Sequence, residues 1–419
     1  MRLMTRTLTL LLLALPASLA AQHAVPRLYL APDLAIDAQQ IKGAGGGSIG
    51  MLSVGPDGRM IVTPKNGLGE IYAFDAGGKS LNWHIPVGDR NGDIGWINRV
   101  GLVGNALWLS DPRYGQVVLI DVKGHVARTI ENPSWVHPRW AERRKYPLFA
   151  AMDAMALYPD SSMLVLPLRP RSVLDTPEFD RSRTHLLRIS AGGAIQRTVA
   201  KYDPDEGRGV TFKGDGRSTH TVPVPFFARS YRIISADGRR IAIVAPGTTE
   251  ADSGTFRVTM LNENGDTVFR RRYPQPAVRV NKASVDSVLS RTRGIVGISA
   301  EQVRAKLARN VPAFRSFLTD AFVGTDHSTW IVRRPVLDTA RARDALVLDD
   351  RGEPLATVRM PDGITPMVVD RAHLWGADRA KNALVRLKLQ PTPAPVVTPT
   401  PAPPTRIEKA ATGKVPAHR

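Results

Sequence analysis

The sequence contains no cysteine. This absence excludes disulfides, thiolate metal ligands, cysteine nucleophiles and the lipidated cysteine of a bacterial lipoprotein. The nine histidines are scattered, with no pair at helical or strand spacing, so a histidine zinc site has no support and we expect no cofactor. No apolar run reaches the roughly 18 residues that a transmembrane helix needs, and we expect none.

The two ends of the chain read as segments outside a folded domain. Residues 1–20 resemble an export signal, because Arg2 and Arg6 precede an apolar run over 8–15 and small residues follow at 18 and 20. Residues 390–419 begin with alternating prolines, which predicts an extended or disordered tail. We therefore expect a periplasmic or secreted protein, folded over residues 21–389 and monomeric.

Acidic residues are few relative to basic ones. The chain has 57 Lys and Arg against 38 Asp and Glu, a formal net charge of +19. Such a charge favours anionic ligands, although a composition this rich in arginine can also reflect the genome. Export argues against nucleic acid, so the partner we expect is an anionic ligand or an envelope component, its identity left open.

One turn pattern recurs along the chain. Five times an apolar run ends in Asp, Ser or Asn and a glycine follows three residues later: Asp75 and Gly78, Asp121 and Gly124, Ser190 and Gly193, Asn262 and Gly265, Asp349 and Gly352. A polar first residue and a glycine at the fourth position are typical of type I turns. Turns reused at this pitch predict a chain built from repeated β-sheet units.

The units have four short strands each, and there are six of them. The sixth lacks its outer strand, since the chain passes from residue 389 directly into the proline tail. An unused strand is present at the other terminus, over residues 25–30. The sequence therefore predicts an all-β, six-bladed β-propeller with four-stranded blades, in which the N-terminal strand closes the last blade.

The segment from Leu109 to Asp121 carries a strand–Asp–loop–strand–Asp pattern, and Trp375 to Val385 is a weaker copy. In this the chain resembles the exported bacterial six-bladed propellers of the NHL-like group. The resemblance covers roughly residues 24–389 and implies a fold. It does not imply an activity.

Long connections predict which end of the propeller carries a binding surface. The segments 86–96, 131–151, 167–183, 201–228 and 275–317 all join strands at one face, where loops on a rigid scaffold usually build binding sites. The last of them is predicted to be partly helical, because Ser299 and Gln302 form a capping box. It is also basic: residues 270–315 contain eleven Lys or Arg and two acids.

Other motifs have ordinary interpretations. The run from Gly46 to Gly50 matches a nucleophile elbow, and Gly45, Gly47 and Gly50 match a dinucleotide fingerprint, but no helix follows either motif. Asp89 to Asp93 opens like a calcium loop and lacks its continuation, so a surface turn is favoured there, as in the acidic run from Asp203 to Gly207. Trp108, Trp330 and Trp375 recur at matching positions, which favours an interblade core over carbohydrate stacking.

Arginines are the candidate ligand-binding residues. Arg99 and Arg229 lie near the starts of predicted innermost strands, and Arg113, Arg333 and Arg379 lie at or beyond the ends of second strands. Converging guanidiniums can bind a carboxylate or a phosphate in a bidentate manner. Alternatively each arginine pairs with a neighbouring acid, such as Asp111 or Asp378.

These observations favour an exported, non-catalytic propeller that binds an anionic ligand or partner through its insertion-bearing face. The first alternative is a propeller hydrolase or lactonase with a central metal, which requires carboxylates converging on the channel. The predicted starts of the inner strands offer only Asp153 and Asp320. The second alternative is a structural protein of the cell envelope.

Overall fold

The computed structural model describes residues 25–37, 40–41, 49–64, 69–83, 85–88, 93–131, 152–167, 184–202, 209–213, 219–227, 229–295, 297–334 and 343–391. The predicted export signal, most of the predicted tail and the acidic run at 203–207 lie outside these residues. So do most of the glycine-rich run at 46–50 and most of the calcium-like segment at 89–93.

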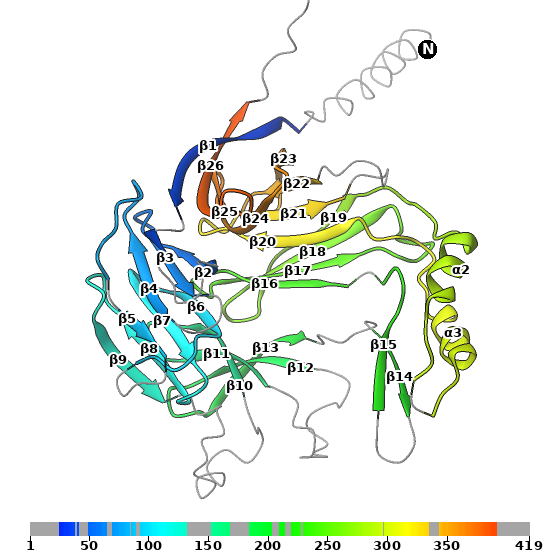
Figure 1. The fold of residues 1–419 in the computed structure, drawn as a ribbon, viewed down its shortest axis with the longest axis horizontal. Helices are drawn as coiled ribbons and strands as arrows, with labels where there is room; N and C mark the ends of the chain where they lie inside the picture. The colour runs from blue at the N-terminus through cyan, green and yellow to red at the C-terminus, as the bar shows by residue number, and fades with distance from the viewer. Residues whose placement is uncertain are drawn as a thin grey trace, which may run out of the picture.

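Four-stranded antiparallel meanders dominate the described chain. The first two are β2 (Ile49–Val54), β3 (Met60–Pro64), β4 (Gly69–Phe74), β5 (Ile85–Val87), and β6 (Arg99–Val103), β7 (Ala106–Asp111), β8 (Gln116–Ile120), β9 (Val126–Glu131). The next two are β10 (Met152–Leu157), β11 (Met163–Pro167), β12 (Thr184–Ile189), β13 (Ile195–Tyr202), and β16 (Tyr231–Ile234), β17 (Arg240–Pro246), β18 (Thr255–Asn262), β19 (Thr267–Pro274). In each of the first two sheets the first strand lies nearer the middle of the molecule than the last (Figure 1).

Eight of the remaining strands form one sheet. It contains β20 (Leu318–Val323), β21 (Thr329–Arg333), β22 (Arg343–Leu348), β23 (Pro354–Met360), β24 (Ile364–Val369), β25 (His373–Asp378), β26 (Ala383–Pro391) and β1 (Arg27–Asp37). The sheets are arranged as in a β-propeller, which confirms a propeller fold. Pairing gives four separate four-stranded sheets and one of eight strands among the described residues, where the repeat predicts six separate blades.

The N-terminal strand joins the two ends of the chain. β1 pairs antiparallel with β26, from Leu28 opposite Pro391 to Asp37 opposite Ala383, and the two strands lie side by side in Figure 1. The terminal strand is longer than the predicted 25–30, and it also pairs in parallel with β23. That second pairing merges two meanders into the eight-stranded sheet.

The five predicted type I turns are confirmed. In each, the glycine N–H donates to the carbonyl of the first turn residue, as from Gly78 to Asp75 (3.0 Å) and from Gly352 to Asp349 (3.1 Å). These glycines have φ between 81° and 89°, a range that side chains disfavour. The Asp75 carboxylate accepts from two further backbone N–H groups of its own turn. Each turn therefore satisfies its own polar groups.

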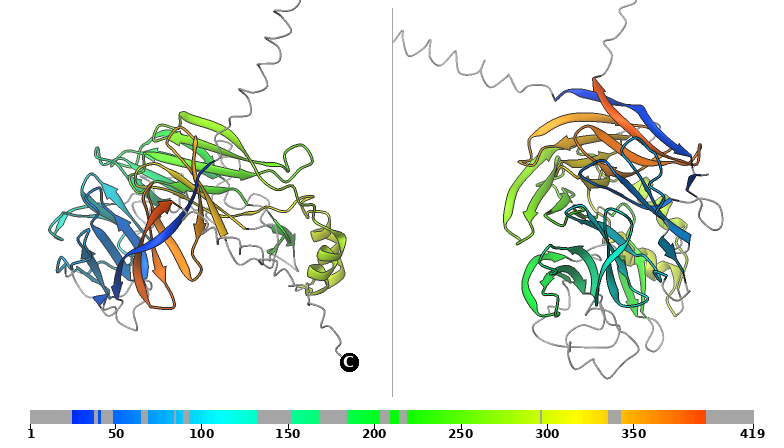
Figure 2. Two further views of the ribbon diagram at one scale, coloured as in Figure 1. Left: turned by 90° about the horizontal axis from the view of Figure 1, so that it is seen from above. Right: turned by 90° about the vertical axis from the view of Figure 1, so that its left-hand side faces the viewer.

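Two insertions pack together into a separate small module, which the sequence did not predict. It consists of the hairpin β14 (Gly209–Lys213) and β15 (Thr219–Pro223) with the helices α2 (Lys282–Ser290) and α3 (Ala300–Ala308). Its buried core is Val210, Phe212, Val224, Leu289, Val303 and Leu307. The helices lie at one edge of the molecule (Figure 2). The predicted capping box of Ser299 and Gln302 is confirmed at the start of α3.

The propeller core follows the strand alternation. Trp108, Trp330 and Trp375 are at most 3% exposed, which confirms their predicted place in the core. Within the described residues, no helix is long and apolar enough to cross a membrane.

Candidate functional site

Six hairpins of the described chain turn at the same end of the propeller. Each joins the first strand of a meander to the second: β2–β3, β6–β7, β10–β11, β16–β17, β20–β21 and β24–β25. Because antiparallel strands alternate in direction, these turns share one end, which we call the turn end. The connections from one meander to the next lie at the other end, which we call the insertion end.

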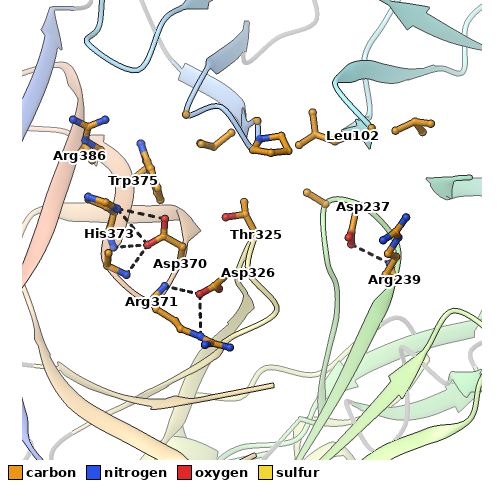
Figure 3. Close-up of a pocket in the computed structure, with 18 of the residues that line it drawn as sticks. Leu102, Asp237, Arg239, Thr325, Asp326, Asp370, Arg371, His373, Trp375 and Arg386 are labelled. Carbon is orange, nitrogen blue, oxygen red and sulfur yellow. Dashed lines mark hydrogen bonds and ion pairs between the residues drawn. The ribbon is translucent and has the colours of Figure 1, made fainter. Parts of the chain in front are cut away.

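A pocket of about 690 Å³ lies at the turn end, and all six hairpins contribute residues to its lining (Figure 3). This volume is in the range of roughly 300–1,000 Å³ that is typical of small-molecule sites. We call it the turn-end pocket.

The lining of the turn-end pocket is divided by composition. The first three hairpins provide only glycine and the apolar residues Val54, Pro56, Leu102, Val103, Leu157 and Pro159. The last three provide the charged and titratable residues Asp237, Arg239, Asp326, Asp370, Arg371 and His373, and β26 adds Arg386. Figure 3 shows Leu102 on the opposite side of the pocket from Asp326, Asp370 and Arg371. The pocket therefore has an apolar wall and a polar wall.

The β16–β17 turn places Asp237 between several donors. Its Oδ1 accepts from the Ser235 hydroxyl (2.5 Å) and the Arg239 N–H (3.0 Å), and its Oδ2 lies 2.9 Å from His327 Nε2. Burial alone raises the pKa of Asp237, but the hydrogen bonds from His327 and Ser235 outweigh burial and lower the pKa to about 2. Asp237 is therefore ionised at neutral pH and satisfied by donors of the protein.

The other two carboxylates of the polar wall are satisfied in the same way. Asp326 accepts from the Ser328 N–H (3.1 Å) and hydroxyl (2.7 Å), and from the Arg371 N–H (3.0 Å). Asp370 accepts from the N–H groups of Ala372 and His373, both at 2.6 Å. The three carboxylates thus fix the shape of their turns.

Contacts between neighbouring turns make the polar wall continuous. His327, in the β20–β21 turn, reaches Asp237 in the β16–β17 turn, and Arg371, in the β24–β25 turn, pairs with Asp326 at 3.2 Å. The Leu102 N–H donates to the Ala236 carbonyl at 2.9 Å, which ties the apolar wall to the polar one. These contacts preorganise the pocket.

His327 adopts a conformation that is unusual for its residue type. Its φ is 65°, close to the φ of 73° that Gly238 adopts in the neighbouring turn. A histidine in this left-handed region costs on the order of 1 kcal/mol or more. The bond to Asp237 gives a physical reason for a histidine at this position.

Within the described residues, no group of three or more His, Asp and Glu is placed to hold a metal ion. Asp153 and Asp320, the two acids that the sequence places on inner strands, have other partners. Asp153 binds Asn98 Nδ2 (2.8 Å) and Arg99, and Asp320 accepts from the Ala321 N–H, with its pKa raised by burial.

Three of the five candidate arginines lie at the insertion end of inner or second strands. Arg99 begins β6, and its Nε lies 3.2 Å from Asp153 Oδ2. The Arg229 guanidinium stacks over the Tyr231 ring at 4.8 Å. Arg333 ends β21 and is half-buried; burial lowers the pKa of its guanidinium.

The other two candidates follow second strands. The Arg113 guanidinium lies over the Tyr114 ring at 5.8 Å, and Arg379 is exposed. Asp111 and Asp378, named as alternative partners, bind backbone N–H groups: Asp111 those of Gly95, Trp96 and Arg113, and Asp378 those of Ala380 and Lys381. A shared ligand for the five arginines therefore stays a prediction.

The basic insertion uses part of its charge internally. Arg304 donates to the carbonyls of Ser290 (3.3 Å) and Thr292 (3.1 Å) at the end of α2, and Lys306 donates to the Thr211 carbonyl of β14 (2.8 Å). By contrast, the guanidiniums of Arg291, Arg293 and Arg309 are exposed and form no ion pair or hydrogen bond among the described residues. These three are exposed, unpaired arginines of the helical part of the module.

Sequence reasoning missed the turn-end pocket because it followed loop length. Part of a signal was present, because the first-to-second-strand turns of the last three meanders carry Asp237, Asp326 and Asp370. Charged residues also occur in the earlier turns, as at Asp57 and Asp160, so the division into two walls depends on which turn residues face the pocket, and the sequence alone does not show this.

No protein-family model matches the chain, and none of the curated proteins matches it. Several solved structures are similar. A member of the DUF4221 family from Bacteroides vulgatus is 10% identical, with 88% of this chain and 99% of that chain covered, at a TM-score of 0.49. A streptogramin B lyase is 11% identical (85% and 98% covered, TM-score 0.37). BamB from Moraxella catarrhalis is 12% identical (86% and 99% covered, TM-score 0.32). At these values the likenesses carry no conclusion about function.

Proposed function

We propose that the chain is an exported six-bladed β-propeller that binds a small ligand, without acting on it chemically, in the turn-end pocket. The observation that carries the proposal is the lining of this pocket by all six first-to-second-strand hairpins. A pocket built at the centre of a rigid scaffold, with an apolar wall and a few placed polar groups, is typical of small-molecule sites.

The count of six blades is supported by the pairing of β1. β1 has nine partner positions in β26 and three in β23, so it belongs mainly with β24, β25 and β26. The eight-stranded sheet then divides into two four-stranded blades linked by a short parallel contact. Export to the periplasm or medium, the monomeric state and the likeness to NHL-like propellers belong to the same proposal.

A non-catalytic role is supported by the internal hydrogen bonds of Asp237 and Asp326, two of the three carboxylates of the pocket. A general base needs a lone pair that faces the substrate. The Asp237 and Asp326 oxygens each accept from donors of the turns, so neither is free to accept a proton from a ligand without breaking the turn that holds it.

Filling the pocket tests the proposal. Ala372 is an exposed lining residue of the β24–β25 turn, and Ala372→Trp fills the space without removing a hydrogen-bonding side chain. Ala191→Trp, in the exposed turn between β12 and β13 outside the lining, is the matched control. With the neutral fluorophore N-phenyl-1-naphthylamine as probe, wild type and Ala191→Trp should bind one equivalent saturably, and Ala372→Trp should bind at least tenfold more weakly. The proposal is contradicted if wild type binds neither this probe nor its anionic analogue 1-anilinonaphthalene-8-sulfonate saturably, or if Ala372→Trp binds as tightly as wild type.

A second candidate function concerns the insertion end. The exposed guanidiniums of Arg291, Arg293 and Arg309 lie on one module and have no partner among the described residues, as shown above. Exposed like charges at this density repel one another and attract anions. We therefore retain an anionic partner at the insertion end, such as an envelope component, as a separate proposal.

A further inference from the structure

The walls of the turn-end pocket differ in what they offer a ligand, and this difference bears on the ligand's chemistry. The apolar wall has no hydrogen-bonding side chain: Val54, Leu102 and Leu157 present aliphatic groups, and Pro56 and Pro159 present rings without a backbone donor. A ligand that covers this wall gains free energy in proportion to the apolar area it removes from water. One part of the ligand should therefore be apolar.

Most acceptors of the polar wall are already in use. Asp237 binds His327, Ser235 and the Arg239 N–H. Asp326 accepts from its own turn and from Arg371. The Oδ1 of Asp370 accepts from two N–H groups of its own turn, and its Oδ2 has a single contact among the described residues, with His373 Nδ1 at 3.4 Å. A ligand that offered only donors, such as an ammonium group, would compete with internal donors at Asp237 and Asp326.

The hydrogen-bond donors of the polar wall, unlike the acceptors, include one side chain without a partner among the described residues. The Arg371 guanidinium is held between Asp326 (3.2 Å) and Asp350 (3.4 Å). The Arg239 side chain, in contrast, is exposed at the pocket and has no acceptor among the residues that the structure describes. Its backbone is fixed by the bond from its N–H to Asp237. Arg239 thus carries unused hydrogen-bonding capacity, and that capacity consists only of donors.

We infer that the ligand is an amphipathic anion, with a carboxylate or phosphate group bound by the Arg239 guanidinium and an apolar body against Val54, Leu102 and Leu157. This inference rests on the proposed function and adds the chemical class of the ligand. An arginine fork binds a carboxylate or a phosphate through two parallel N–H···O bonds. Asp237 lies close to Arg239 but is satisfied by His327, so it holds the turn without occupying the guanidinium.

The test compares two probes that differ by one charged group. The anion 1-anilinonaphthalene-8-sulfonate and the neutral N-phenyl-1-naphthylamine share the same ring system, so their difference in affinity reports the anionic group. Wild type should bind the anionic probe at least tenfold more tightly. Arg239→Gln should lower the affinity for the anionic probe by about 10-fold or more, the size expected for a charge-assisted pair. It should change the affinity for the neutral probe by less than twofold.

Two variants serve as controls. Arg351→Gln removes an exposed arginine of the turn end that does not line the pocket and should leave both probes unchanged. Ala372→Trp should weaken the binding of both probes. Thermal unfolding of each variant confirms that the fold is retained.

Competition then separates the two sources of an anionic group. Decanoate, decyl phosphate and decanol are titrated against the bound anionic probe. Displacement by decanoate alone identifies a carboxylate ligand, displacement by decyl phosphate alone a phosphate ligand, and displacement by both supports the shared chemistry. If wild type binds the neutral probe as tightly as the anionic one, or if Arg239→Gln weakens the binding of neither probe, the ligand is not an anion bound by Arg239. The proposal that the pocket binds a small ligand is then unaffected. If wild type binds neither probe, the proposed function fails as well.

Discussion

At the turn end of the propeller, Asp237, Asp326 and Asp370 each bind donors of the surrounding turns. At the insertion end, Arg291, Arg293 and Arg309 extend from the helical module into solvent. The turn end is short in sequence and closely bonded apart from the exposed Arg239 side chain, whereas the insertion end is long in sequence and holds these three unpaired arginines. The pocket lies at the first of these ends.

This difference in internal bonding affects how each end would bind a partner. Internal partners preorganise the turn end, so a ligand there would lose little ordering free energy on binding. Long-range attraction from exposed arginines instead raises encounter rates and depends on salt. The two ends are therefore suited to two kinds of partner, and each can be altered without the other unless the ring itself opens.

The largest expected effect comes from a deletion that opens the ring and so disrupts both ends of the propeller. Deletion of residues 21–34 removes most of β1, including Leu28 and Leu30, which pack against the core of the eight-stranded sheet. Full burial of two leucines would account for roughly 3–6 kcal/mol, and the contribution of these half-buried side chains is smaller. The deletion also leaves unpaired strand edges that promote aggregation. We expect the variant to melt at least 10 °C below wild type and to aggregate on size-exclusion chromatography.

Truncation after Pro391 is the control for this deletion. It removes no residue that the structure describes, so the melting temperature should stay that of wild type. A soluble monomer with the wild-type melting temperature after deletion of residues 21–34 would show that β1 does not close the ring.

Much of the propeller could be predicted from the sequence because local chemistry determines it. The turns at Asp75 and Asp349 need only a polar first residue and a glycine, and both signals lie within four positions. Closure by β1 followed from counting strands at the two ends. The parallel contact of β1 with β23 could not be predicted in this way, because it depends on how adjacent blades approach one another.

The sites were less predictable because they depend on contacts between distant turns. His327 and Asp237 are 90 residues apart, and Lys306 reaches Thr211 over 95 residues. No periodicity in the chain links such pairs. Loop length pointed to the insertion end, but a pocket requires converging walls, and short turns on neighbouring inner strands supply these.

Charge reversal at the insertion end should have the next largest effect, on binding to anionic vesicles. Arg291→Glu, Arg293→Glu and Arg309→Glu together should weaken binding to phosphatidylglycerol-containing vesicles by at least tenfold at low salt, since each basic residue near an anionic surface contributes about 1 kcal/mol. Arg304 and Lys306 are left intact because they hold the module together. Vesicle sedimentation measures the change, and probe binding in the turn-end pocket should not alter.

A variant of equal charge controls for net charge alone. Lys123→Glu, Arg197→Glu and Arg351→Glu change three exposed basic residues outside the helical module and lower the net charge by the same amount. If this control loses as much vesicle binding as the module variant, or if neither loses any, the exposed arginines of the module are not a binding surface.

The smallest expected effect is confined to the turn end and depends on pH. The pKa of Asp237 is lowered to about 2 in the folded protein, against 3.8 without perturbation. A carboxyl with a lowered pKa stabilises the fold above its unfolded value, and this contribution is lost as the pH falls through the folded value. The upper bound is about 2.5 kcal/mol, and because a third of the side chain is exposed, solvent screening leaves about 1 kcal/mol. Asp237→Asn should therefore be less stable than wild type by about this amount at pH 7, and the difference should vanish between about pH 4 and pH 2.

Urea unfolding at a series of pH values measures this difference in stability, with Asp266→Asn, an exposed turn carboxylate of the same sheet, as the control. The charged and titratable groups that face Asp237 from other turns are His327 and Tyr158, and His327→Gln should remove most of the same pH-dependent difference. A difference that stays constant down to pH 2 would mean that Asp237 stabilises its turn through packing, and that the polar wall is not held by the charge of this pair.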